Sequence, residues 1–315
     1  MNQLEILKNL STHIANTYVD TNFAKSKWPS IEANAKARIE KGIHQSAFHT
    51  LMKQIVNELN LSHCEFLTPQ LSDKSSQDII PDFLQMTMKS TEDYVYLRVP
   101  TLWVPHFDFD SFSDFIEKSG DKKVILDLRL NTGGSLSAVG KILGLFGGSD
   151  RPFAYTRLRQ WREFTMPGLV YPLEDKDNLN QVGDVEKVCS FPHLEWCTAK
   201  PVNLHLKKEV YALIGPSTFS CGELLAQGIH ELKIGTSIGE KTAGKLTLAR
   251  DDFELGYGYH ACLPFASIVS RERYKIEGKG VKPMIDLVIE DSIEKELSHD
   301  RILEILQINS QKGEI

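Results

Sequence analysis

The sequence predicts an α/β fold with a covered parallel sheet, preceded by a helical subdomain. Residues 124–146 and residues 209–232 each have the pattern of a buried strand, a tight turn and a helix. A strand–turn–helix order that occurs twice is typical of βαβ units. Residues 3–60 instead repeat apolar side chains at helical spacing, which predicts the helical subdomain.

The length of 315 residues and the hydrophobic fraction of 41% allow one large core with an accessory domain. We expect the helical subdomain to span residues 1–68 and a polar linker to span 69–92. The α/β domain then covers 93–290 and contains an irregular insertion or lid at 155–205. A C-terminal helix is expected within 291–315.

Hydrophobic patterns place the elements of the α/β domain. Continuous apolar runs between turn residues are typical of buried strands, whereas a period of 3.6 indicates helices. The expected elements are, in order, a strand at 94–99, a helix at 109–116, a strand at 124–129, a helix at 136–146, a strand at 209–215, a helix at 220–232, β structure at 246–275 and a helix at 302–308.

Composition excludes several functional classes. Lys and Arg total 36 against 42 acidic residues, and a net charge of -6 provides no basic surface for nucleic acid. No stretch approaches the roughly 20 apolar residues that span a bilayer. The N-terminal residues lack the basic and apolar regions of a secretory signal. We therefore expect a cytoplasmic protein without a nucleic-acid or membrane partner.

The cysteines do not suggest a metal site. They are five in number and irregularly spaced, without the paired spacing that zinc sites need. We expect reduced thiols and neither a metal nor an organic cofactor. The cysteines are Cys64, Cys189, Cys197, Cys221 and Cys262.

Ser220 is a candidate nucleophile because it stands at the predicted start of a helix, after a sharp turn. Free backbone N–H groups point outward at such a position, so the N–H of Cys221 could bind an oxyanion. Gly133 and Gly134 follow another strand and could supply a second donor. A serine after a turn more often caps a helix, however, and a glycine pair is usually a turn. These residues alone leave both interpretations open.

A phosphate-binding loop is excluded at residues 239–245, although they have the Gly-x4-Gly-Lys skeleton. The next residue is Leu246, not the Ser or Thr that would reach a magnesium ion. The following residues have a strand-like pattern where a helix is required. A nucleotide hydrolase is therefore not expected.

Four segments carry motifs in a fixed order. Residues 126–134 have the sequence Leu-Asp-Leu-Arg-Leu-Asn-Thr-Gly-Gly, and residues 216–223 have Pro-Ser-Thr-Phe-Ser-Cys-Gly-Glu. Residues 238–245 have Ile-Gly-Glu-Lys-Thr-Ala-Gly-Lys, and residues 276–283 have Ile-Glu-Gly-Lys-Gly-Val-Lys-Pro. In this order they resemble the motifs of the C-terminal-processing, or tail-specific, serine peptidase superfamily. The helical N-terminal region, which ends in Leu61-Ser62-His63, resembles the segment that closes the N-terminal helical region of that family.

The resemblance covers about residues 10–290 and departs from the family at Met284, where aspartate is usual. It implies a core of the crotonase or ClpP type and hydrolysis of a peptide or protein substrate through an acyl-enzyme on Ser220. The oxyanion would bind the N–H groups of Cys221 and of Gly133 or Gly134. The sequence leaves open whether the protein forms a homo-oligomer.

Members of the superfamily use one of two catalytic arrangements with different general bases. This sequence contains residues that fit each arrangement. A Ser–Lys dyad would use Lys245, which lies 25 residues after Ser220 as in the family. That branch normally has a PDZ domain and a glutamine four residues after the lysine. Only about 27 residues separate His63 from the first strand, too few for a PDZ domain, and the glutamine position holds Ala249.

The second branch is similar to the tricorn core protease and uses a serine, a histidine and a glutamate. His63 and Glu277 fit that pattern, and Ser62 is the small polar residue that helps to orient the histidine. His63 would accept the Ser220 proton and Glu277 would fix its tautomer. We prefer this branch, which leaves Lys245 a secondary role.

A third hypothesis belongs to a different functional class. The same fold includes retinoid-binding modules, which resemble these peptidases without needing proteolysis. A non-catalytic module that binds a hydrophobic ligand or a peptide would explain Met284 and the mixed signals for the base. It would not readily explain why the candidate nucleophile, histidine, glutamate and glycine pair all occur together.

Overall fold

The structure is a computed structural model that divides into two compact units. The first unit comprises residues 1–79, 152–200 and 245–278, and the second comprises 80–151, 201–244 and 279–315. The units therefore interleave along the chain, whereas the sequence suggested contiguous domains. The residues that the structure describes are 2–69, 84–103, 106–147, 153–159, 195–197, 206–289 and 295–312.

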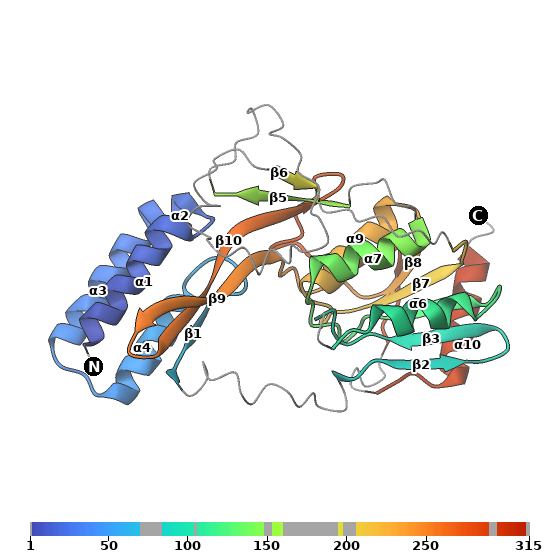
Figure 1. Ribbon diagram of the computed structural model, residues 1–315, viewed down its shortest axis with the longest axis horizontal. Helices are drawn as coiled ribbons and strands as arrows, with labels where there is room; N and C mark the ends of the chain where they lie inside the picture. The colour runs from blue at the N-terminus through green and yellow to red at the C-terminus, as the bar shows by residue number, and fades with distance from the viewer. Residues whose placement is uncertain are drawn as a thin grey trace. The chain divides into compact units, whose positions relative to one another are not determined.

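Four helices begin the first unit (Figure 1). In α1, the residues Ile6, Leu7, Leu10 and Ile14 recur at helical spacing and are at most 2% exposed, which buries one face of the helix. The prediction of a helical N-terminal region is thereby confirmed. The helices are α1 (Gln3–Thr17), α2 (Thr21–Ser26), α3 (Trp28–Glu40) and α4 (Gln45–Asn57).

An antiparallel sheet completes the first unit. Its central strand β10 pairs with β1, β5 and β9, and β5 pairs with β6. Because β1 pairs with β10, the end of the helical region belongs to the same unit as residues 245–278. The strands are β1 (Glu65–Leu67), β5 (Ala154–Leu158), β6 (Glu195–Cys197), β9 (Thr247–Gly256) and β10 (Tyr259–Ser270).

The predicted insertion at 155–205 begins within β5 and includes β6. The rest of it, residues 160–194 and 198–205, lies outside the described residues. The β structure predicted at 246–275 forms the β9–β10 hairpin, whose turn passes through Tyr257 at a φ of 58°.

A six-stranded sheet forms the centre of the second unit, in the order β11-β8-β7-β4-β3-β2. All neighbouring strands are parallel except β2, which pairs antiparallel with β3. The predicted α/β class is confirmed. The strands are β2 (Thr87–Ser90), β3 (Tyr94–Arg98), β4 (Lys123–Asp127), β7 (Val210–Ile214), β8 (Gly235–Gly239) and β11 (Ile285–Asp286).

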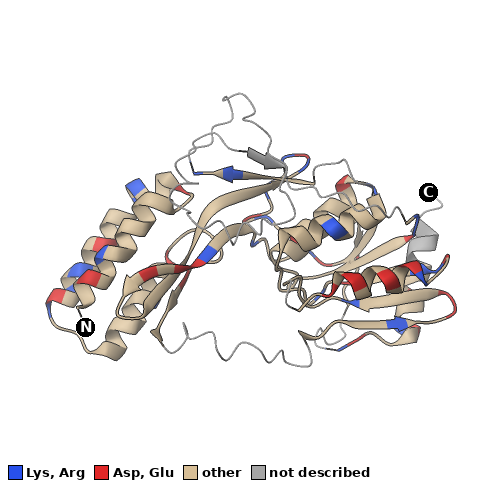
Figure 2. Cartoon of the chain, viewed as in Figure 1, with Lys and Arg blue, Asp and Glu red and all other residues tan. Residues whose placement is uncertain are grey.

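Helices cover this sheet, and every residue of β3 and β7 is buried. Helix α9 contacts β7, β8 and α7, while α10 packs on side chains such as Tyr96, Tyr211 and Leu213. The strands β7 and β8 carry no charged side chain, whereas α6 carries three acidic residues and α7 one lysine (Figure 2). The helices are α6 (Phe109–Glu117), α7 (Leu136–Gly147), α9 (Cys221–Glu231) and α10 (His299–Lys312).

Two expected peripheral segments belong to this second unit. Strand β2 lies within the predicted linker 69–92, most of whose other residues lie outside the described part of the chain. The C-terminal helix α10 contributes Ile302 and Ile305 to the buried cluster on the sheet. The helix is therefore part of the core of the unit and not an appendage.

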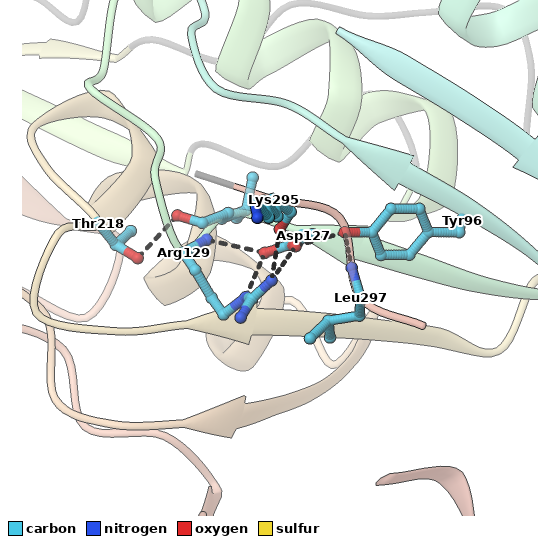
Figure 3. Close-up of polar contacts among 7 residues, drawn as sticks. Tyr96, Asp127, Arg129, Thr218, Lys295 and Leu297 are labelled. Atoms are coloured by element: carbon cyan, nitrogen blue, oxygen red, sulfur yellow. Dashed lines mark hydrogen bonds and ion pairs between the residues drawn. The ribbon is translucent and has the colours of Figure 1, made fainter. Parts of the chain in front are cut away.

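A buried ion pair closes the end of β4 (Figure 3). Arg129 Nη2 lies 2.9 Å from Asp127 Oδ2, and each side chain is 2% exposed. The Tyr96 hydroxyl donates to the same carboxylate at 2.5 Å, and Arg129 donates to the main-chain oxygen of Lys295 at 3.4 Å. These contacts tie β3, β4 and the C-terminal segment together, so Asp127 and Arg129 stabilise the strand end.

Candidate active site

Ser220 occupies a sharp turn between β7 and α9 in the second unit. Its backbone has a φ of 53° and a ψ of −121°, and α9 begins at the next residue. A non-glycine residue in such a conformation costs about 1–3 kcal/mol and persists only where surrounding contacts hold it. Strained serines at strand-to-helix turns are typical of nucleophiles. Within the described chain, His63 is another of the five non-glycine residues with positive φ.

Glu223 holds the turn around Ser220. Its carboxylate accepts the Ser220 N–H at 3.2 Å, the Thr242 hydroxyl at 2.5 Å and the Gly244 N–H at 2.6 Å. The side chain is completely buried, so these donors replace the water that the carboxylate would otherwise bind. Sequence analysis placed Glu223 in a motif but gave it no function; the Ser-x-x-Glu spacing was the available signal.

The glycine pair lies in the loop after β4, with φ values of 86° for Gly133 and 141° for Gly134. Asn131 organises this loop, because its side-chain oxygen accepts the Gly133 N–H at 2.9 Å. Its amide group donates to the Val99 oxygen at 2.7 Å, and its main-chain oxygen accepts the Phe219 N–H at 2.8 Å. Asn131 therefore fixes the glycine loop against the turn that carries Ser220.

Gly133 packs directly against Ser220. A Cβ atom at this position would lie 2.6 Å from Ser220 Cβ, 3.1 Å from Ser220 Oγ and 3.1 Å from the Cys221 nitrogen. Only glycine fits, because such distances are shorter than ordinary van der Waals contact and the φ is positive.

The Cys221 thiol anchors the second glycine. Its sulfur donates to the Gly134 carbonyl at a distance of 3.1 Å. Burial raises the pKa of the Cys221 thiol to about 12, so the group stays protonated and remains a donor near neutral pH. A thiolate nucleophile at this position is therefore not available.

Two backbone donors remain for a ligand. The Gly133 N–H is bound by Asn131, whereas the main-chain N–H groups of Gly134 and Cys221 have no hydrogen-bond partner among the described residues. Cys221 directly follows Ser220, and Gly134 follows the glycine that packs on Ser220 and accepts the Cys221 thiol proton through its own carbonyl. Paired backbone N–H groups of this kind can stabilise a developing oxyanion.

A second polar cluster, in the first unit, surrounds His63. The His63 Nδ1 atom lies 2.8 Å from Ser62 Oγ, which donates to Glu277 Oε2 at 2.8 Å. Glu277 also accepts the main-chain N–H groups of Ser62 at 2.7 Å and Leu246 at 2.6 Å. Because the Ser62 hydroxyl gives its only proton to the carboxylate, its oxygen accepts from Nδ1–H. This network assigns the neutral tautomer that carries its proton on Nδ1 and its lone pair on Nε2.

The charge state of His63 suits a base. Burial lowers the pKa of His63 below its ordinary value of 6.5; the Glu277 carboxylate partly offsets this effect, and the positive charge of Lys245 adds to it. The imidazole is therefore neutral at neutral pH.

Lys245 is exposed. Lysines that act as general bases are typically buried. The structure does not provide that burial.

The structure thus gathers the predicted residues into two groups. Ser62, His63 and Glu277 meet in the first unit, each with contacts to at least one of the others. Ser220, Cys221, Gly133 and Gly134 meet in the second unit. The part of the chain that the structure describes contains no group of three or more His, Cys, Asp or Glu residues that could hold a metal ion. None of its helices is both long and apolar enough to cross a bilayer.

The family model of peptidase family S41 matches residues 93–287, which is more than half of the chain. The protein belongs to peptidase family S41.

Solved structures share the fold over nearly the whole chain. A candidate peptidase from Parabacteroides merdae has a TM-score of 0.65 at 13% identity, covering 96% of this chain and 93% of its own. A lipoprotein from Streptococcus agalactiae has a TM-score of 0.61 at 16% identity, covering 92% and 93%. The photosystem II D1 C-terminal processing protease has a TM-score of 0.59 at 12% identity, covering 92% and 94%. No curated protein matches the sequence significantly.

Proposed function

We propose that the protein is a serine peptidase that hydrolyses peptide bonds through an acyl-enzyme on Ser220. The observation that carries this proposal is the strained Ser220 at the start of α9, beside the N–H of Cys221. This group and the N–H of Gly134 have no hydrogen-bond partner among the described residues. A serine held in this way presents its hydroxyl beside donors for a tetrahedral intermediate. Membership of peptidase family S41 supports the same chemistry.

In the proposed reaction, His63 Nε2 removes the proton of Ser220 Oγ as that oxygen attacks the peptide carbonyl carbon. The carbonyl oxygen gains a negative charge, which the two N–H groups stabilise. The imidazolium then gives the proton to the leaving amine, and the acyl-enzyme forms. A water molecule, deprotonated by the same histidine, releases the second product and restores the serine.

Ser62 and Glu277 would serve His63 as a relay. Glu277 holds Ser62 through two hydrogen bonds, and Ser62 Oγ accepts the Nδ1 proton. The carboxylate stabilises the imidazolium through the serine hydroxyl between them. The alternative Ser–Lys dyad has less support, because the Lys245 side chain is exposed.

Active-site labelling tests the nucleophile. A fluorophosphonate probe is expected to modify wild-type protein at Ser220 alone, as located by mass spectrometry of the labelled peptide. Ser220→Ala should abolish the labelling, while Ser217→Ala, which alters an exposed serine of the same turn, should retain it. Labelling that survives in Ser220→Ala would sink the assignment. Absence of labelling in folded wild-type protein would favour a binding module.

The pH dependence of kcat/KM tests the base. Neutral His63 accepts the proton, so activity should be lost as the pH falls through its lowered pKa, placing the acid limb below 6.5. Lys245→Met removes a charge that lowers this pKa, so the limb should move to higher pH. The measurement is kcat/KM against pH for both proteins with a fluorogenic peptide. An acid limb above 6.5 in the wild type contradicts the assignment.

A further inference from the structure

Thr247 places a second hydroxyl against the imidazole of His63. Its Oγ1 atom lies 3.2 Å from His63 Nδ1 and 3.4 Å from Ser62 Oγ. Thr247 is only 4% exposed, so water competes little for these contacts. The family motifs in the sequence gave no indication of this contact.

The proton of Thr247 has a defined destination. The hydroxyl donates to the main-chain oxygen of Ser62 at 3.2 Å, and a carbonyl oxygen can only accept. The Thr247 oxygen therefore faces His63 Nδ1 as an acceptor. The Nδ1–H group consequently has two acceptors, Ser62 Oγ and Thr247 Oγ1.

The start of β9 fixes this hydroxyl in place. Thr247 pairs with Ser267 of β10 in the antiparallel sheet. The preceding residue, Leu246, donates its N–H to Glu277 Oε2 at 2.6 Å. The residue before β9 and the first residue of β9 thus contact the carboxylate and the imidazole, so the start of this strand sets the geometry of both.

We propose that Thr247 is a positioning residue, whose oxygen helps to keep the proton of neutral His63 on Nδ1 and stabilises the imidazolium during turnover. This inference rests on the proposed role of His63 as the base. The charged groups that act on this imidazole are Glu277 and Lys245. Thr247 adds a neutral acceptor to that set, and its effect is therefore expected to be smaller than theirs.

Isosteric substitution tests the proposal in the full-length protein. Thr247→Val removes the hydroxyl and keeps the shape, whereas Thr247→Ser keeps a hydroxyl. Thr156→Val is the matched control, because Thr156 is a completely buried threonine of the same unit whose hydroxyl has no partner among the described residues. The readouts are the titration and tautomer of His63 by ¹⁵N NMR, assigned with His63→Ala, and kcat/KM against pH.

Thr247→Val is expected to lower kcat/KM by about 5- to 10-fold, the effect of one lost hydrogen bond. The acid limb should move to lower pH, since the imidazolium loses an acceptor, and the fraction of the Nδ1–H tautomer should fall. Thr247→Ser should restore most of each property, and Thr156→Val should match the wild type.

Two outcomes overturn the proposal: an unchanged His63 titration in Thr247→Val, or a changed titration with unchanged kcat/KM. Failure of the proposed function would give a different result from failure of the role of Thr247. Full activity in His63→Ala would remove His63 from the reaction, whereas an inactive His63→Ala with an unaffected Thr247→Val would overturn the role of Thr247 alone.

Discussion

His63→Ala is expected to lower kcat/KM by about 10⁴-fold, whereas Lys245→Met should lower it by less than about tenfold. The histidine is half-buried, and its Nδ1 proton has an acceptor, so its Nε2 lone pair is the proposed site for the serine proton. The lysine is exposed and acts on His63 only through its charge. Steady-state kinetics with a fluorogenic peptide, on variants whose thermal unfolding matches the wild type, measures both effects.

The reverse order of effects would assign the protein to the Ser–Lys branch. Glu277→Gln distinguishes a relay from a passive neighbour, because a carboxamide offers one acceptor oxygen where Glu277 uses both. We expect a loss in kcat of orders of magnitude in that variant as well. A variant with wild-type kcat would show that Glu277 only stabilises the fold.

Gly133→Ala is expected to reduce kcat by about 10²-fold or more, the loss that follows removal of one oxyanion donor. The new Cβ would lie 2.6 Å from Ser220 Cβ and 3.1 Å from the Cys221 nitrogen. Either the serine or the glycine loop must move, and the N–H groups no longer converge beside the hydroxyl. Burst kinetics with an ester substrate would locate the loss in acylation.

Gly120→Ala is the matched control for backbone strain. Gly120 belongs to the same unit and has a φ of 60°, but a Cβ there meets nothing within 4 Å. Both variants should lose about 1–2 kcal/mol of unfolding free energy from the left-handed conformation. Only Gly133→Ala should lose activity. Equal activities in the two variants would contradict the packing of Gly133 against the nucleophile.

The sequence predicted the strands that carry continuous apolar runs, and the reason is physical. Strands β4 and β7 are covered on both faces, so the three central residues of β4 and all residues of β7 are apolar or aromatic. Strands β8 and β2 lack such a run: β8 has the sequence Gly-Thr-Ser-Ile-Gly, and the edge strand β2 has Thr-Met-Lys-Ser. Their pairing depends on neighbours far along the chain, which periodicity does not reveal.

The same distinction applies to the site. The turn before Ser220 and the adjacent glycine pair are local patterns, so the sequence alone raised them as candidates. The carboxylate of Glu223, in contrast, gains its partners from Thr242 and Gly244, about 20 residues later. The Asn131 side chain accepts the Gly133 N–H, so of the two glycines only Gly134 has an N–H without a partner among the described residues. These roles depend on loop packing and need the three-dimensional structure.

The buried Cys221 thiol affects how the enzyme withstands oxidants and alkylating agents. Peroxides and iodoacetamide react with the thiolate form, and with a pKa of about 12 the Cys221 thiolate is a minute fraction near neutral pH. Cys221 is also only 3% exposed, and its thiol proton is directed at the Gly134 carbonyl. The cysteine next to Ser220 therefore imposes no requirement for a reducing environment. Its resistance to these reagents follows from its burial and from the same hydrogen bond that anchors Gly134.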